Sequence, residues 1–263
     1  MATRDDDAGT PTDVSESDGG SVVRRPGFLY LFGRVVLSTI ARTVYRPKVI
    51  GRRNVPKDGA VILASNHLAF IDSIVIPVTA PRRVQFLAKS HYFEGHGLKG
   101  RIQKAFFTSI GAVGVTRGAG QAAQEALDQS KRILDTGSAF AVYPEGTRSQ
   151  DGRLYKGRTG VAWLALTTGA PVVPVGLIGT DQLQPAGKIM PRFRRITVVF
   201  GEPIDVSAYG TATSGRARRL ATDQIMSAIQ RCSGQEEAGV YNEAPPSGRV
   251  ERIKRAVMHP ERM

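Results

Sequence analysis

His67 and Asp72 are the residues of this chain whose types and spacing best suit proton transfer. They follow the apolar run 60–63 and precede a second apolar run, 74–76. We interpret this pattern as a strand that ends at His67, a turn, and then a helix. On one continuous helix, two residues five positions apart point about 140° away from each other. The two side chains can therefore meet only if the backbone turns between them.

A turn at the end of a strand would let Asp72 bond one imidazole nitrogen of His67. That bond fixes the tautomer and leaves the other nitrogen free to take a proton from a hydroxyl group. The pair therefore has the parts of a general base and its orienting carboxylate, with no Ser or Cys nucleophile required. The alternative is a hydrogen-bonded structural histidine at the end of a strand.

A second motif, Tyr143-Pro-Glu-Gly-Thr-Arg-Ser149, follows the apolar run 139–142. Together with the HX4D motif of His67 and Asp72, it resembles the glycerolipid acyltransferase family of 1-acylglycerol-3-phosphate acyltransferases. Two weaker blocks, 114–117 and 173–175, occur in the order of that family. The resemblance covers roughly residues 48–205.

The resemblance implies transfer of a fatty acyl group to the free hydroxyl of 1-acylglycerol-3-phosphate (lysophosphatidic acid), which gives phosphatidic acid. The donor would be acyl-CoA or acyl carrier protein, acting as a co-substrate. No further cofactor is expected, and no metal either, because His91, His96 and His259 have no Cys or His partner at ligand spacing. No covalent acyl-enzyme is expected either.

The same resemblance assigns roles to site residues. His67 and Asp72 would be catalytic, while Glu145 and Gly146 would orient the acceptor or the oxyanion. Arg117 and Arg148 would clamp the glycerol phosphate, because a guanidinium fork binds phosphate oxygens in pairs. The remaining predicted substrate contacts are Asn66, Lys89, Thr147 and Lys156.

Two departures from the family pattern leave the acceptor open. Ala69 stands where a Ser is common, and His91 stands where an acidic residue often occurs. An alternative function is the same chemistry on another lysophospholipid or polar lipid. A further alternative is a non-catalytic basic module for nucleic acid or anionic membrane. Nucleic acid is disfavoured because the basic residues are scattered and form no recognisable nucleic-acid motif.

The charge distribution indicates an anionic partner. The first 20 residues carry six acidic side chains and one arginine, so the formal net charge of +13 becomes +18 over the remainder. Such a basic protein could bind nucleic acid, an anionic membrane surface or phosphate-bearing small molecules. The single cysteine, Cys232, excludes an intramolecular disulfide and lies far from the motifs.

The chain divides into four predicted parts. Residues 1–22 would form a disordered acidic tail and residues 247–263 a basic tail, on either side of a catalytic domain over 47–246. Residues 23–46 would form an amphipathic helix at the membrane interface, because four polar residues recur at every fourth position: Arg34, Ser38, Arg42 and Arg46. The arginines among them disfavour a helix that spans the membrane. We therefore expect a peripheral or monotopic protein on the cytoplasmic face of the cell membrane. The alternative is a helix packed on the domain with its arginines in water.

Strand and helix patterns alternate through the central domain. Strands are expected at 84–88, 110–115, 138–142, 172–178 and 196–200, and helices at 121–134, 160–168 and 217–229. This alternation predicts a single α/β domain with a mostly parallel twisted sheet flanked by helices, preceded by the amphipathic N-terminal helix. The string Gly95–Gly100 matches G-x-G-x-x-G but lies too far from its strand for a dinucleotide site, so a mobile loop is expected there.

Overall fold

The computed structural model describes Val35, Thr39, Thr43 and residues 45–115, 120–188 and 190–243 of the 263-residue chain. The predicted acidic tail, most of the predicted interface helix and the predicted basic tail lie outside these residues. They therefore stay predictions. Among the described residues, no helix combines the length and the apolar character that crossing a bilayer requires.

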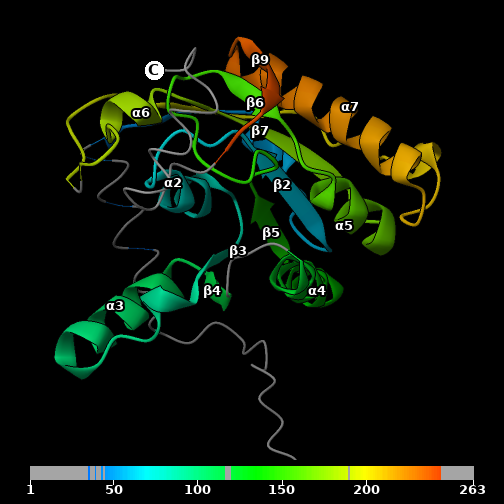
Figure 1. Cartoon of the computed structure of the whole chain (residues 1–263). Helices are drawn as coiled ribbons and strands as arrows, with labels where there is room; N and C mark the ends of the chain where they lie inside the picture. The colour runs from blue at the N-terminus through cyan, green and yellow to red at the C-terminus, as the bar shows by residue number, and fades with distance from the viewer. Residues whose placement is uncertain are drawn as a thin grey trace, which may run out of the picture.

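A seven-stranded sheet forms the centre of the molecule (Figure 1). Its spatial order is β1 (Lys48–Ile50), β8 (Thr197–Phe200), β7 (Val172–Ile178), β2 (Val61–Ser65), β5 (Ala139–Val142), β3 (Val84–Lys89) and β4 (Ala112–Val115). Every pairing is parallel except that of β7 with β8. The predicted mostly parallel α/β sheet is thus confirmed.

Helices cover both faces of this sheet. The helices are α2 (Asp72–Thr79), α3 (Gly97–Ser109), α4 (Gln121–Asp135), α5 (Gly160–Thr168), α6 (Thr180–Leu183) and α7 (Gly215–Ser233). Strand β2 shows why the sheet needs a layer of helices on each face, because all five residues of the strand are buried. Val61 and Leu63 pack into the cluster that includes α2, whereas Ile62 and Ala64 pack against α4, α5 and α7. A continuous apolar run is typical of a parallel strand covered on both faces.

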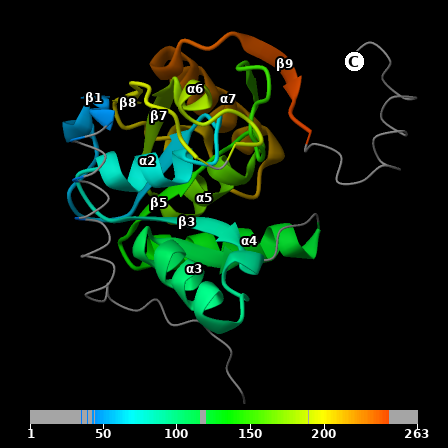
Figure 2. The same cartoon turned by 90° about the vertical axis from the view of Figure 1, so that its left-hand side faces the viewer.

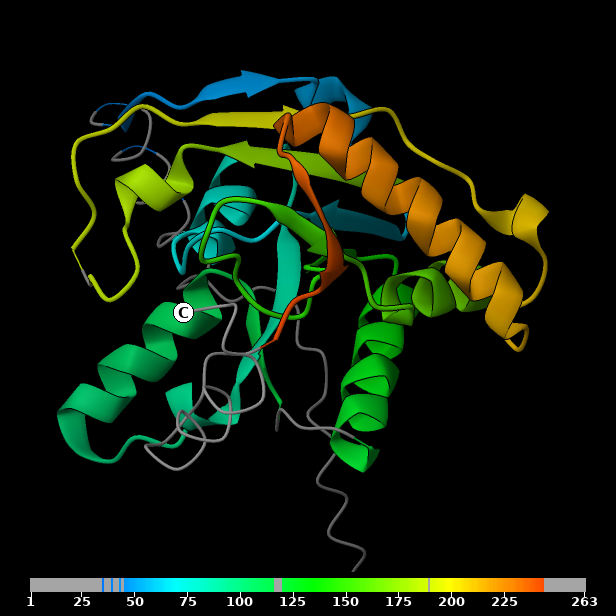
Figure 3. The same ribbon diagram turned by 45° about the horizontal axis from the view of Figure 1, so that its top comes forward.

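The longest helix of the described residues, α7, lies close against β7. A Cβ atom built at Gly176 would lie 2.4 Å from the backbone of Cys232, so only glycine permits this approach. After α7 the chain forms β9 (Glu237–Tyr241), which pairs with β6 (Leu154–Lys156) in a second, two-stranded sheet. Figure 3 shows this pair beside the end of α7, with β9 in orange.

The predicted mobile loop at Gly95–Gly100 was wrong. Helix α3 begins at Gly97, and His96 is its N-cap residue. A Cβ atom at Gly100 would lie 1.9 Å from the carbonyl oxygen of Gly95, so the glycines allow the chain to fold back closely on the first turn of the helix. Their spacing reflects this close backbone contact.

Candidate active site

The predicted contact between His67 and Asp72 is present. His67 is the second residue after β2 and Asp72 is the first residue of α2, and Nδ1 of the imidazole lies 2.9 Å from Oδ2 of the carboxylate. The same oxygen accepts the backbone N–H groups of Leu68 (2.7 Å) and Ala69 (2.8 Å). The turn is therefore folded around one buried carboxylate oxygen. The His67 side chain is 13% exposed, and its Nε2 is the nitrogen left for a substrate.

Glu145 holds the backbone of His67. Its side chain is fully buried, and its oxygens accept the backbone N–H groups of His67 and Tyr155, each at 3.0 Å. The backbone N–H of Ser149 donates to the carbonyl of His67 at 2.8 Å, so the second motif binds both backbone groups of this residue. Glu145, which was predicted to orient the acceptor or the oxyanion, thus uses both carboxylate oxygens to hold backbone and positions His67.

Burial dominates the titration of this carboxyl group. The pKa of Glu145 is raised from 4.5 to about 7, because the effect of burial, helped by the nearby charges of Asp72 and Asp151, exceeds that of the two backbone hydrogen bonds, which lower the pKa. The carboxylate is held at the junction of three segments, near two other acidic groups.

Tyr143 is a site residue whose contact with His67 the sequence did not predict. Its ring stacks on the imidazole with centroids 3.9 Å apart and planes 11° apart, and its hydroxyl lies 3.4 Å from Oγ of Ser73. The available signal was its position directly after β5, which neighbours β2 in the sheet. The ring restricts the orientation of the imidazole plane.

Asn66, a predicted substrate contact, uses its side chain to bind other parts of the protein. It is fully buried, its Oδ1 accepts the N–H of Leu177, and its Nδ2 donates to the carbonyl of Leu177 and to Gln235. The amide thus ties the end of β2 to β7. Gln184 binds the turn from His67 to Asp72, because its Oε1 accepts the backbone N–H of Ile71 at 2.8 Å.

The predicted phosphate-binding motif forms an exposed turn. Gly146 adopts φ +78°, a left-handed conformation that favours glycine, and a Cβ there would lie 3.0 Å from Nε of Arg158. Arg148 is exposed and Thr147 is half-buried, while Asn242 donates to both of their carbonyl groups. Arg158, which follows β6, is a second basic residue beside this turn, and the sequence did not indicate it.

The remaining predicted contacts are dispersed. Lys89 is exposed at the end of β3, in register with Val115 of β4. Arg117 follows β4 but lies outside the described residues, so its role stays a prediction. Lys156 is exposed on β6, next to Tyr155, and belongs to the small second sheet.

The fold and this site define a class of protein. A mostly parallel sheet presents a histidine–aspartate pair at a strand end, and the segment Tyr143-Pro-Glu-Gly-Thr-Arg-Ser149 holds the backbone of the histidine, which is the arrangement expected of an acyltransferase domain. The Acyltransferase family model matches residues 46–178, and the chain belongs to this family. The resemblance seen in the sequence is thereby confirmed.

Individual relatives agree with this assignment. A chloroplastic 1-acyl-sn-glycerol-3-phosphate acyltransferase of Brassica napus is 27% identical over 62% of this chain and 46% of its own length. One from Chlamydomonas reinhardtii is 32% identical over 55% of this chain and 42% of its own. The chain thus spans less than half the length of these two relatives. The crystal structure of the 1-acyl-sn-glycerophosphate (LPA) acyltransferase PlsC from Thermotoga maritima is similar, with TM-score 0.56, 25% identity and 77% of each chain covered.

Proposed function

We propose that this protein acylates the free hydroxyl of 1-acylglycerol-3-phosphate from acyl-CoA or acyl carrier protein, giving phosphatidic acid. The observation that carries the proposal is the 2.9 Å contact between His67 Nδ1 and the buried Asp72 carboxylate in a chain of the Acyltransferase family. The names of the relatives suggest the acceptor. We also propose a peripheral or monotopic position on the cytoplasmic face of the cell membrane.

The chemistry requires one proton to move twice. His67 Nε2 takes the proton of the acceptor hydroxyl while that oxygen attacks the thioester carbonyl carbon. The carbon–sulfur bond then breaks, and the departing thiolate takes up the proton from the imidazolium. Asp72 stabilises the imidazolium between these two transfers, and no acyl group becomes attached to the protein.

The direct test is turnover by the purified full chain. With oleoyl-CoA and lysophosphatidate, we expect release of coenzyme A and formation of phosphatidic acid, measured by mass spectrometry of the lipid product. Acyl carrier protein thioester is supplied in a parallel reaction to compare the donors. Lysophosphatidylcholine and monoacylglycerol compete in the same reaction. Exclusive acylation of either competitor would overturn the proposed acceptor while leaving the acyl-transfer chemistry in place.

Arg148 is expected to bind the phosphate of the acceptor. Its exposed guanidinium lies on the turn that also holds His67. We expect Arg148→Gln to raise KM for lysophosphatidate about tenfold, because a charge-assisted hydrogen bond is lost, with little change in KM for the acyl donor. Arg148→Lys should lie between the two, and Arg216→Gln on α7 is the matched surface control. An unchanged KM in Arg148→Gln would contradict this role.

Tyr143 is expected to hold the imidazole ring in place. Tyr143→Leu removes the stacked ring, and we expect kcat to fall about threefold to tenfold, consistent with the usual energy of an aromatic pair. Tyr143→Phe keeps the ring and loses only the hydroxyl near Ser73, so it should stay close to wild type. Equal losses in the two variants would show that the hydroxyl matters and the stacking does not.

A further inference from the structure

The loop between α6 and β8, residues 184–195, combines exposed apolar and basic side chains. Phe193 is 81% exposed and Met190 is 79% exposed, which makes them the two most exposed large apolar side chains of the described residues. Between Asp181 and Glu202 the sequence contains no acidic residue. Four exposed basic side chains alternate with the apolar ones in the loop: Lys188, Arg192, Arg194 and Arg195.

This 184–195 loop is held in place at both ends. Leu183 is buried before it and Ile196 after it, and the backbone N–H of Arg192 donates to the carbonyl of Leu183 at 2.7 Å. Next to Arg192, the ring of Phe193 stacks on Tyr45, with centroids 6.0 Å apart. The exposed side chain of Phe193 is therefore presented to solvent from an anchored position.

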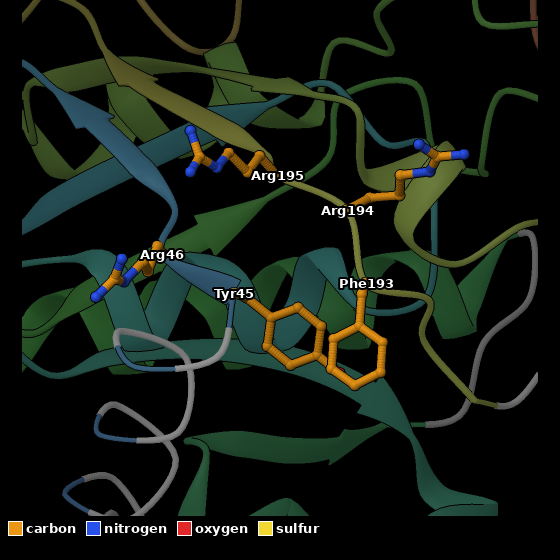
Figure 4. A pocket seen from close by; sticks show the side chains of 5 residues that line it. All are labelled: Tyr45, Arg46, Phe193, Arg194 and Arg195. Carbon is orange, nitrogen blue, oxygen red and sulfur yellow. The ribbon is translucent and has the colours of Figure 1, made fainter.

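Two basic side chains of the loop, Arg194 and Arg195, diverge instead of pointing toward one shared small ligand (Figure 4). Tyr45, Arg46, Phe193, Arg194 and Arg195 line a shallow hollow, and Figure 4 shows the guanidinium groups of Arg194 and Arg195 pointing in different directions from the backbone. Such an arrangement suits many separate anionic groups on a surface better than a single phosphate.

The 184–195 loop also lies beside the catalytic turn. Gln184 at its base accepts the backbone N–H of Ile71, within the turn from His67 to Asp72. Figure 2 shows α2, α3 and α6 on one side of the molecule. On α3, Leu98 and Ile102 are exposed together with the basic residues Arg101 and Lys104. The mixture of apolar and basic side chains thus recurs on this side of the molecule.

We propose that the 184–195 loop docks onto an anionic lipid bilayer. Met190 and Phe193 enter the interfacial region, while the four basic side chains contact lipid phosphates. A bilayer is favoured over nucleic acid because exposed aliphatic side chains such as Met190, Leu98 and Ile102 offer bases no stacking surface. The purpose of the docking rests on the proposed function, since it would place His67 where a lysophospholipid leaves the membrane.

Sedimentation of the full chain with vesicles tests the docking. Met190→Ser/Phe193→Ser is expected to lower partitioning onto phosphatidylglycerol-rich vesicles at least about tenfold. Lys188→Gln/Arg192→Gln/Arg194→Gln should give a similar loss, and its effect should disappear on pure phosphatidylcholine vesicles. The matched controls lie on α7, where Leu220→Ser and Arg216→Gln/Arg231→Gln should bind like wild type. Loop variants that sediment like wild type, or that lose only DNA binding, would overturn the proposal.

A depth measurement isolates the 184–195 loop from every other part of the chain. Trp163 is the single tryptophan, so Trp163→Phe gives a protein without tryptophan fluorescence. Phe193→Trp is added to this background and, as a control, Leu220→Trp. We expect lipids brominated on their acyl chains to quench Trp at position 193 and to leave Trp at position 220 unquenched. Absence of quenching at position 193 would overturn the proposal, whether or not the protein binds the vesicles.

Binding and turnover separate the two proposals. Neither vesicle measurement requires an acyl donor. Loop-dependent binding without any turnover by the wild-type protein would overturn only the proposed activity. Turnover together with binding that is insensitive to the loop variants would overturn only the docking role.

Discussion

Replacing His67 with alanine is expected to lower kcat for acyl transfer by about 10²- to 10⁴-fold, the usual contribution of a positioned general base. Without the imidazole, the acceptor hydroxyl must lose its proton to water during attack on the thioester. KM for both substrates should change far less, because neither the phosphate nor the acyl chain requires contact with Nε2. Initial rates of coenzyme A release, measured with detergent-dispersed lysophosphatidate, give both constants.

Two controls distinguish loss of the base from loss of the fold. In His67→Ala, Asp72 Oδ2 still has the N–H groups of Leu68 and Ala69, so the turn should persist and urea unfolding should change little. His96→Ala removes an exposed imidazole that makes no capping hydrogen bond, and it should keep wild-type activity. Wild-type kcat in His67→Ala would remove this residue from the mechanism.

Much of the sheet could be predicted because its strands are buried on both faces. The run 172–178 is apolar apart from one glycine and lies between Pro171 and Gly179, and it forms β7 with the predicted bounds. The antiparallel direction of β8 could not be predicted in this way, since a short apolar run is equally compatible with a parallel and an antiparallel strand. The second sheet was missed because β6 is only three residues long and its partner β9 lies far along the chain.

The site was predictable where chemistry depends on neighbours in sequence, and less so where it depends on neighbouring strands. The contact of His67 with Asp72 needs only a local turn, which the residue types favour. The stacking of Tyr143 depends on β5 lying beside β2, with Ala64 opposite Val142, and the sequence does not give this order. The motif also identifies Glu145 as a candidate site residue, but the sequence does not indicate whether its carboxylate contacts a ligand or the backbone.

Glu145→Gln is expected to weaken both the fold and the site. The carboxylate accepts two buried N–H groups, those of His67 and Tyr155, whereas the amide of glutamine has only one oxygen. One backbone N–H would then face an NH₂ group, which costs about 1–3 kcal/mol in unfolding free energy. Because the affected N–H can be that of His67, kcat should fall as well. Glu202→Gln, at an exposed carboxylate, is the control and should unfold like wild type.

The difference in stability between wild type and Glu145→Gln, followed as a function of pH, provides the sharper measurement. Burial raises the pKa of Glu145 to about 7 in the folded protein, against 4.5 in an unfolded chain, so between these values the folded state holds a proton that the unfolded state has released. The stability that this proton contributes is fully present below about pH 4.5 and is lost as the pH rises through 7, up to about 3 kcal/mol in total. Glutamine does not titrate. The unfolding free energy of wild type minus that of Glu145→Gln, from urea denaturation, should therefore decrease between about pH 5 and pH 8. A constant difference across this range would mean that the folded protein keeps Glu145 ionised throughout, and that the two backbone N–H groups outweigh its burial.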